Sequence, residues 1–522
     1  MPPSFFSLVL LHAAALAGYT AAQDEFALPE DILIGAGVSA FQTEGAWNLE
    51  GKAESAVDHL LNSSRLAALG FGDGAGEHGT AANSYVRFRE DVKMAADLKL
   101  QLYRFSISWA RLLPTGDASN VNDHGVTFYN NLIDEILVHN MTPMATLHHF
   151  DHPQILEDQF GAWQDIKMVD KFKEYARFAF NTFGDRVKLW TTINEPNMYC
   201  VYFPAMNQIA GYLNKTDEYG CVHNMVLAHM EAYDVFKTKR LSGKVGFTAK
   251  LMPAVAKSTR EQDVFLAEAF NQMHAGNVLH PVTFGDYPPL YKRLVRTQKL
   301  PEFTTEQKKK LKGSSDFLGL NVYFGFEAAY SAKLNSTPPT AFPGVGKVLQ
   351  ELEHLSLTLD VHGTDTSMIA GYTSIEPQVM ERALLWTWNS YGLPIVITEN
   401  GYGDVTGLAK HDQPRAAYHS AMLRSLASTV NTYDVKVLGY CVWSLLDAFE
   451  WSGGFKRPFG LVHVDYEHKS LNRSLKDSAS FFQDLAKSSP RVVPFVSGAA
   501  GASSVGTVLT IVSLACTFIF RQ

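Results

Sequence analysis

Two glutamates, Glu195 and Glu399, stand at the polar ends of two short apolar runs in a chain of 522 residues. The runs cover residues 187–196 and 394–401, and each glutamate is followed directly by residues that end strands. Burying a carboxylate at the end of a core strand is costly, so this placement indicates a chemical role. Two such carboxyl groups predict a site in which one transfers a proton and the other acts as a nucleophile.

The two runs belong to a regular alternation of apolar runs and helical patterns between residues 25 and 490. Eight strands and one (β/α)8 TIM barrel with long loops after its strands follow from this alternation. The predicted strands are 32–38, 100–107, 141–147, 187–194, 244–250, 317–324, 394–400 and 435–443. Helical patterns lie between most of them, for example at 84–98, 126–138, 167–183, 224–241 and 376–390.

The ends of seven of these eight strands carry further polar and aromatic side chains. Barrels of this kind hold their active sites at the carboxyl ends of the strands. A face that only stabilised the barrel would not need Glu, His, Asn, Arg and Trp together at one rim. The residues are Gln42, Arg104, His149, Asn194, Glu195, Asn321, Tyr323, Glu399, Trp443, Glu450 and Trp451.

These segments resemble glycoside hydrolase family 1, the β-glucosidase family, over about residues 25–487. Each motif alone is modest, but six in the family's order are specific. They are Phe-Gln-Thr-Glu-Gly-Ala-Trp (41–47), Tyr-Arg-Phe-Ser-Ile-Ser-Trp (103–109), Thr-Ile-Asn-Glu-Pro (192–196), Asp-Phe-Leu-Gly-Leu-Asn-Val-Tyr (316–323), Ile-Thr-Glu-Asn-Gly (397–401) and Trp-Ser-Leu-Leu-Asp-Ala-Phe-Glu-Trp (443–451). The resemblance implies an exo-β-glycosidase that acts mainly on β-glucosides, with galactosides or fucosides as further substrates.

The resemblance also implies roles for individual residues. Glu195 would be the general acid/base and Glu399 the nucleophile. Arg104 would pair with Glu399 and keep it ionised, and Tyr323 would hydrogen-bond to Glu399, with Asn321 beside it. The residues expected to bind the sugar or to line the pocket around it are Gln42, His149, Asn194, Glu450, Trp443, Trp451, Phe459 and, on the leaving-group side, Tyr372.

Elementary chemistry supports this division of roles. A nucleophilic carboxylate must stay charged, so a cation such as Arg104 should stand next to Glu399. The acid must hold its proton near neutral pH, and the nearby charge of Glu399 would raise the pKa of Glu195. Enzymes that retain configuration hold the two carboxyl groups roughly 5–5.5 Å apart, which is the spacing expected here. A carboxylate at Glu450 disfavours sugars that carry a 6-phosphate group.

Four positions depart from the family pattern. Phe150 and Tyr372 stand where Trp is usual, Pro458 where Arg is usual, and His148 where Tyr is usual. Pro458 removes a cation and a backbone donor beside the sugar subsite. Tyr372 gives a smaller platform with a polar tip. These changes bear on substrate preference and not on the chemistry of the two glutamates.

Composition and cysteine use are those of a globular protein outside the cytosol. The chain is 46% hydrophobic, and its net charge of −8 without a basic block argues against nucleic acid as a partner. A disulfide is predicted between Cys200 and Cys221, whereas Cys441, in an apolar run, is predicted to be a buried free thiol. N-glycosylation is expected at Asn62, Asn214, Asn335 and Asn472, and burial is expected to block the acceptor at Asn140.

Both ends of the chain resemble processing signals around a predicted glycosidase domain of residues 23–490. An apolar run at 5–17 before a small-residue cleavage site predicts a signal peptide over residues 1–22. The terminal apolar stretch at 505–520 has 16 residues, short for a membrane span of ~20. Residues 491–522 therefore favour a GPI-attachment signal over a transmembrane anchor. Either reading predicts an extracellular domain, as in a secreted or surface-bound animal member of the family.

No cofactor and no metal site is expected, because no metal-binding spacing is apparent. The expected partner is a small-molecule or oligosaccharide β-glycoside, with contact to a membrane only through a lipid anchor or C-terminal segment. Two alternatives stay open. A thioglucosidase has a better leaving group and can dispense with the acid, which this chain keeps as Glu195. A non-catalytic glycan-binding protein on the same fold would lose one or both carboxylates, and both are present.

Overall fold

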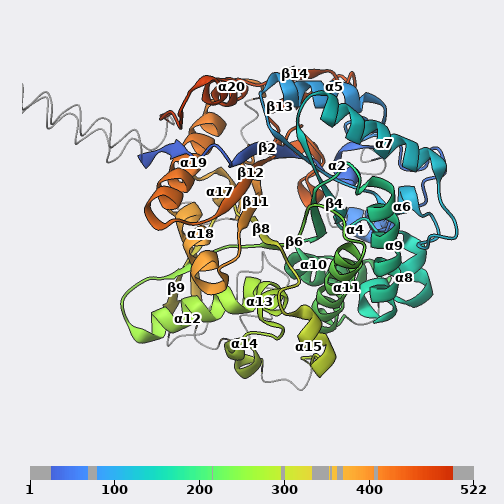
Figure 1. Cartoon of the computed structure of the whole chain (residues 1–522), viewed down its shortest axis with the longest axis horizontal. Coiled ribbons are helices and arrows are strands. Elements are labelled where there is room, and N and C mark those ends of the chain that lie inside the picture. Colours follow the sequence, from blue (N-terminus) through green and yellow to red (C-terminus); the bar gives the residue numbers. More distant parts are fainter. Residues whose placement is uncertain are drawn as a thin grey trace, which may run out of the picture.

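Eight of the described strands close into one parallel barrel, and helices surround it (Figure 1). The structure is a computed structural model that describes residues 25–68, 79–213, 216–295, 300–331, 352, 355–360, 368–404 and 409–497. The barrel strands are β2 (Leu33–Gly37), β3 (Leu102–Ser106), β4 (Thr142–His148), β5 (Leu189–Asn194), β6 (Lys244–Lys250), β8 (Phe317–Asn321), β11 (Ile395–Asn400) and β12 (Val437–Trp443). All eight strands predicted from the sequence are found, and the (β/α)8 TIM barrel is confirmed.

The barrel strands are short apolar runs because both of their faces are buried. Side chains from five strands meet in a cluster separate from the rest of the core, as expected for a barrel interior filled by alternating residues. This cluster contains Leu102, Met144, Phe317, Val396 and Cys441. Cys441 is a buried free thiol, as its apolar run predicted.

The outer layer contains the five helices that the sequence patterns indicated. They are α5 (Ser84–Asp97), α7 (Asp123–Val138), α9 (Lys167–Phe183), α11 (Glu218–Thr238) and α18 (Gln378–Tyr391), and α19 (Gln413–Tyr433) lies beside α18 (Figure 1). Helix α11 begins before the predicted residue 224 because Asp217 caps it, accepting a hydrogen bond from the Gly220 amide.

Long connections follow the barrel strands and carry most of the remaining elements. One small sheet pairs β1 (Ala27–Leu28) with β15 (Arg491–Val492), and another pairs β13 (Val462–Val464) with β14 (Arg473–Leu475). In a third, β9 (Phe326–Tyr330) lies between β7 (Ala254–Ala256) and β10 (Leu355–Leu359). The other α-helices are α2 (Ala40–Thr43), α3 (Ala56–Leu61), α4 (Ser64–Ala68), α6 (Trp109–Leu112), α8 (Gln154–Phe160), α10 (Pro196–Ala210), α12 (Glu261–Asn271), α13 (Asn277–Phe284), α14 (Pro289–Leu294), α15 (Thr305–Leu311), α17 (Met368–Thr373) and α20 (Ala479–Lys487). Two 3-10 helical segments lie at η2 (Ala162–Gln164) and η4 (Trp451–Lys456), and a π-helical segment lies at η3 (Gln272–Gly276).

The predicted disulfide joins Cys200 and Cys221, whose Cα atoms lie 5.6 Å apart. The two cysteines lie in helices, in α10 and α11, rather than at the edges of a loop. The bond therefore fixes the helix that starts directly after Glu195 against a helix of the outer layer.

Of the asparagines in N-glycosylation motifs, those that the structure describes are all exposed, including one that was expected to be buried. Asn62 and Asn472 are exposed, as expected. Asn140 is exposed as well, so the expectation that burial blocks it is wrong: it lies in the turn between α7 and β4 with a φ of 57°. Asn214 and Asn335, the signal peptide at 1–22 and the tail from residue 498 lie outside the described residues.

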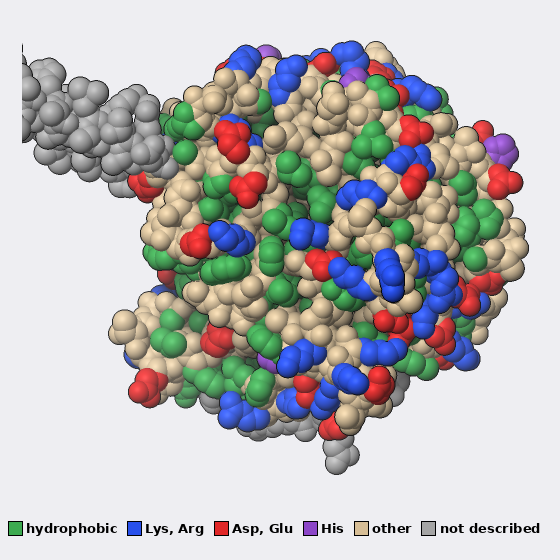
Figure 2. Space-filling model, in the orientation of Figure 1, with side chains coloured by type: hydrophobic (Ala, Val, Ile, Leu, Met, Phe, Trp, Pro, Cys, Tyr) green, Lys and Arg blue, Asp and Glu red, His purple; other side chains and the backbone are tan. Residues whose placement is uncertain are grey.

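On the face shown in Figure 2, Lys and Arg side chains are interspersed with Asp and Glu. Across the described ranges, no helix combines the length and the apolar character that crossing a membrane requires.

Breaking the disulfide should lower the free energy of unfolding by about 3 kcal/mol, because the bond closes a loop across a sequence separation of 21 residues. The measurement is urea unfolding with and without reductant, for the wild type and for Cys200→Ala/Cys221→Ala. The wild type should lose stability in reductant and the double variant should not respond. An equal response of both proteins would contradict the prediction.

Candidate active site

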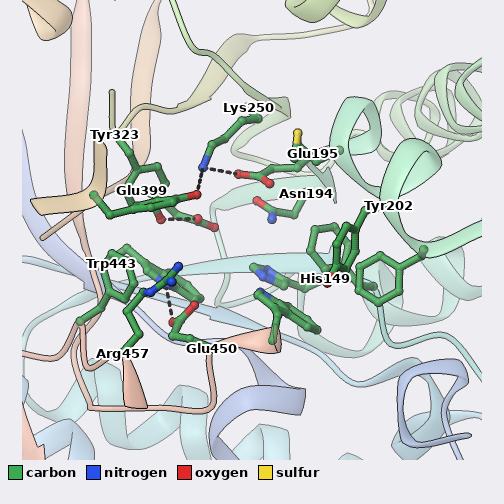
Figure 3. A pocket seen from close by; sticks show the side chains of 16 residues that line it. His149, Asn194, Glu195, Tyr202, Lys250, Tyr323, Glu399, Trp443, Glu450 and Arg457 are labelled. Atoms are coloured by element: carbon green, nitrogen blue, oxygen red, sulfur yellow. Dashed lines mark hydrogen bonds and ion pairs between the residues drawn. The ribbon is translucent and has the colours of Figure 1, made fainter. Parts of the chain in front are cut away.

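A pocket opens where the barrel strands end, and most of the residues predicted from the sequence line it (Figure 3). Gln42, Arg104 and Asn321 are buried behind this lining and reach it through hydrogen bonds. The lining consists of His149, Phe150, Asn194, Glu195, Met198, Tyr202, Phe203, Lys250, Tyr323, Tyr372, Glu399, Trp443, Glu450, Trp451, Arg457 and Phe459.

Glu399 lies on β11 with a hydrogen-bond donor at each carboxylate oxygen. Arg104 Nη1, from β3, donates to Oε1 at 2.8 Å, and the Tyr323 hydroxyl, directly after β8, donates to Oε2 at 2.9 Å. All three side chains are buried. Burial, followed by the charge of Glu399, holds the pKa of Tyr323 well above its usual range, so the phenol stays a donor. A guanidinium and a phenol at these distances stabilise the ionised form of Glu399.

Glu195 follows β5 in a left-handed conformation with a φ of 45°, and Pro196 then begins α10. This sharp change of direction turns the carboxyl group into the pocket, where Asn321 Nδ2 donates to its Oε1 at 2.7 Å. Burial raises the pKa of Glu195 to about 7, and the charge of Glu399 adds to the rise, while Lys250 opposes it. The charge of Glu399 was expected to raise this pKa, but the loss of solvent around Glu195 is the larger cause.

Asn194 and Asn321 connect the surroundings of the two glutamates. Arg104 Nη2 donates to Asn194 Oδ1 at 2.7 Å, and Asn321 Nδ2 donates to the same oxygen at 3.2 Å. Asn321 lies beside Glu399 in the sheet, as expected, and its amide also contacts Glu195. The guanidinium that holds one carboxylate is thus joined through two amides to the other, which fixes their relative orientation.

A second cluster surrounds Glu450 on the segment after β12. Glu450 Oε1 accepts hydrogen bonds from Trp443 Nε1 at 2.9 Å and from Gln42 Nε2 at 3.2 Å. His149 stacks against Trp443 with ring centroids 5.6 Å apart. Burial raises the pKa of Glu450 to about 8. A carboxyl group, an amide, an indole and an imidazole at one end of an apolar pocket suit a ligand rich in hydroxyl groups.

Aromatic rings form the walls between the two clusters. Trp451 lies 5.2 Å from Phe150 and 5.5 Å from Phe203, centroid to centroid. Tyr372 packs edge-on against Tyr323 and Phe459 at 5.3 and 5.7 Å. Apolar ring faces suit the C–H faces of a sugar ring and an apolar leaving group.

Two cations of the pocket were missed by the sequence argument. Lys250 ends β6, and its Nζ lies 3.9 Å from Glu195 Oε1 and 3.5 Å from the Tyr372 hydroxyl. Lys250 could have been identified from the sequence, because it closes an apolar run as the two glutamates do. Arg457 lies directly before Pro458, with Cζ 5.7 Å from the centroid of the Tyr372 ring. Pro458 removes the positive charge that the family usually has at this position, and the neighbouring Arg457 supplies one instead.

The arrangement can perform acid–base and nucleophilic chemistry at one centre. One buried carboxyl group, Glu399, is paired with the Arg104 guanidinium, and another, Glu195, keeps its proton to near-neutral pH. Environments that separate two carboxyl groups in this way assign one as nucleophile and the other as acid. Among the described residues, no three His, Cys, Asp or Glu side chains are grouped as metal ligands would be.

Comparison with known proteins gives matches along nearly the whole chain. The model of glycosyl hydrolase family 1 matches residues 24–490. Myrosinase 1 of Brevicoryne brassicae is 35% identical, covering 88% of this chain and 98% of its own. Beta-glucosidase 11 of Arabidopsis thaliana is 33% identical, covering 92% and 96%. A rice β-glucosidase variant, solved in a covalent complex with glucose, superposes with a TM-score of 0.80 at 30% identity, covering 88% of this chain and 99% of the rice chain.

Glu195→Gln should change how stability depends on pH. Folding raises the pKa of Glu195 from 4.5 to about 7, so the folded state disfavours the ionised carboxyl group more than the unfolded state does. Burying ionised Glu195 therefore lowers the free energy of unfolding. This loss is absent below pH 4.5, grows as the pH rises towards 7 and is complete above pH 7, where it is on the order of 3 kcal/mol. In urea unfolding at pH 4.5 to 8, the variant should gain stability over the wild type as pH rises. A constant difference would show that Glu195 does not titrate in this range.

Proposed function

The chain belongs to glycosyl hydrolase family 1 and is an O-glycosyl hydrolase, and we propose that it is an exo-β-glucosidase with Glu399 as nucleophile and Glu195 as general acid/base. The observation that carries the proposal is the contrast between the two carboxyl groups. Glu399 accepts hydrogen bonds from Arg104 and Tyr323, whereas burial keeps Glu195 protonated to near-neutral pH.

In the first step, a Glu399 oxygen attacks the anomeric carbon while the bond to the leaving group breaks. Glu195 gives its proton to the leaving oxygen, and a covalent glycosyl-enzyme forms. Arg104 and Tyr323 stabilise Glu399 before attack and release it as its charge is lost to the new ester bond. Asn194, whose oxygen accepts a hydrogen bond from Arg104, would bind the sugar 2-hydroxyl.

In the second step, Glu195 is ionised and takes a proton from water. The water oxygen attacks the anomeric carbon from the side that the leaving group vacated, and Glu399 is released as a carboxylate. Two inversions give net retention, and the proton taken by Glu195 restores the starting state. Lys250 assists this step, because its positive charge stabilises the ionised form of Glu195.

The cluster around Glu450 is proposed to bind the hydroxyl groups of the terminal sugar. Gln42, His149 and Glu450 would contact the hydroxyl groups remote from the anomeric carbon, with Trp443 beneath the ring and Trp451 and Phe459 at its sides. Glucose is the proposed sugar. Galactosides and fucosides belong in the test because these sugars differ from glucose at the 4- and 6-positions that this cluster would read.

Glu399→Gln should lower kcat/KM for a chromogenic aryl β-glucoside by about three orders of magnitude or more, because no covalent intermediate can form. The assay follows release of the phenol, with galactosides, fucosides, oligosaccharides and a glucosinolate as further substrates. Equal turnover by the variant and the wild type would reject Glu399 as nucleophile. No turnover of any glycoside by the wild type would favour the glycan-binding alternative, and glucosinolate preferred over every O-glycoside would favour a thioglucosidase.

Glu195→Gln is the variant to compare with Glu399→Gln, because it removes the proposed acid/base and leaves the proposed nucleophile in place. It should retain the first step only for leaving groups that need no proton, so a dinitrophenyl glucoside should give a burst followed by slow turnover. Proton NMR of the first sugar released by the wild type should show the β-anomer. Release of the α-anomer would contradict the proposed double displacement.

We also propose that the enzyme works outside the cytosol, secreted or held at the cell surface by a GPI anchor. The Cys200–Cys221 disulfide supports this, because such bonds persist in oxidising compartments. The exposed acceptors at Asn62 and Asn472 are consistent with glycosylation during secretion.

Expression of the whole chain in a cell with a secretory pathway should give N-glycosylated protein. Digestion with a peptide N-glycosidase should increase its mobility in gel electrophoresis, and Asn62→Gln and Asn472→Gln should each remove part of that shift. Asn140→Gln belongs in the set because Asn140 is exposed. A chain that carries no glycan would contradict secretion by this route.

A further inference from the structure

Lys250 is a rigidly held cation in the interior of the pocket (Figure 3). The residue is 5% exposed, and burial does not neutralise it, because Tyr372, Glu195 and Glu399 together raise the pKa of its ammonium. Asn197 fixes the backbone on both sides: its Nδ2 donates to the Lys250 carbonyl at 2.9 Å, and its Oδ1 accepts from the Lys250 amide at 3.1 Å. The side chain then lies over Tyr323, with Nζ 3.8 Å from the ring centroid.

The position of Lys250 is on the leaving-group side of the proposed reaction centre. Its ammonium contacts Glu195, Tyr323 and Tyr372. The proton donated by Glu195 goes to the leaving atom, and a hydrogen bond adds roughly 3 Å to the 3.9 Å between Nζ and Glu195 Oε1. Lys250 is therefore within reach of groups attached close to the leaving atom.

The charges around Lys250 do not balance when the site is ready to react. Glu399 is already paired with Arg104, and Glu195 must be protonated to act as an acid. His274, on η3, is also near, but burial followed by the charge of Lys250 lowers its pKa to about 3, so it is neutral. Tyr323 and Tyr372 offer a ring face and a hydroxyl group but no anion. In this state the Lys250 ammonium loses the attraction of Glu195 and keeps only that of Glu399, which Arg104 already pairs, and a buried ammonium with so little compensation is costly.

A second cation lies along the same wall. Lys250 Nζ is 5.4 Å from the centroid of the Tyr372 ring, and Arg457 Cζ is 5.7 Å from it. Tyr372 is the residue that replaces the usual Trp on the leaving-group side. This wall therefore combines a ring with two positive charges, which an uncharged leaving group would not need.

We propose that Lys250 and Tyr372, with Arg457 nearby, form a subsite for a negatively charged group on the leaving portion of the substrate. The ligand class is a β-glucoside whose aglycone carries a carboxylate or a comparable oxyanion close to the glycosidic atom. When Glu195 is protonated and loses its negative charge, the anionic group of the aglycone pairs with the Lys250 ammonium in its stead. This inference rests on the proposed function and names the substrate class of that site.

The test compares two aryl β-glucosides that differ in charge, the 3-carboxyphenyl and the 3-carbamoylphenyl compound, at pH 6 to 7. The quantity measured is the ratio of their kcat/KM values. Lys250→Gln should lower this ratio roughly tenfold or more, the factor that corresponds to 1.4 kcal/mol of lost interaction. Lys250→Arg should keep it within about threefold, because the guanidinium also binds carboxylates. A changed protonation of Glu195 affects both substrates and cancels in the ratio.

Lys436→Gln is the matched control, because it removes the same charge from an exposed position. It should leave the ratio unchanged. An unchanged ratio in Lys250→Gln would overturn the proposal and leave Lys250 as an ion-pair partner of Glu195. A wild type that hydrolyses neither compound would instead count against the proposed function.

Direct binding tests the subsite without turnover and without a variant. Calorimetric titration of the wild type with 3-hydroxybenzoate and 3-hydroxybenzamide, in the presence of glucose, should give at least tenfold tighter binding of the carboxylate. Equal affinities, or tighter binding of the amide, would overturn the proposal even if Lys250→Gln fails to fold.

Discussion

Charge buried at the mouth of the barrel is the constraint on which the rest of the site depends. Glu195, Glu399 and Glu450 are all buried in one pocket, and each loses the hydration that stabilises a carboxylate. Only Glu399 receives a close guanidinium, from Arg104. The other two respond to burial by holding their protons to higher pH. One apolar environment thus contains a carboxyl group paired with a guanidinium and two carboxyl groups that keep their protons to higher pH.

The parallel barrel is the reason that this selective pairing can be built. Strands far apart in the sequence end at the same rim, so β3 can deliver the guanidinium that holds a carboxylate from β11. Asn194 and Asn321, from two other strands, then join that guanidinium to Glu195. Because each strand is held by its neighbours, the relative positions of these polar groups do not depend on flexible loops.

The βα connections contribute the parts that select a substrate. The segment after β12 brings Glu450, Trp451, Arg457 and Phe459 to the pocket, and α17 brings Tyr372. Two of the four departures from the family pattern, Tyr372 and Pro458, lie in these segments, and the other two, His148 and Phe150, lie at the end of β4. A scaffold that fixes the reactive groups on strands leaves its loops free to vary with the leaving group.

Much of this arrangement could be read in advance from the chain. The eight strands followed from apolar runs that the structure confirms nearly residue by residue, and strand ends pointed to the pocket residues because a barrel collects those ends at one rim. Asn321 lies beside Glu399 in the sheet, as expected, but the hydrogen bond of its amide to Glu195 was not predicted, since a register does not say which way an amide points. Lys250 was overlooked although its position at a strand end gave the same signal.

The sequence by itself determined the order of the elements and the types of group at each strand end, because hydrophobic periodicity and breaker residues are local properties of the chain. Only the tertiary structure decided which groups lose solvent together and which find a partner. The pKa of Glu195 is set mainly by burial and then by Lys250 and Glu399, which lie on other strands. Desolvation and electrostatic pairing depend on distances through space, and the spacing of residues along the chain does not contain those distances.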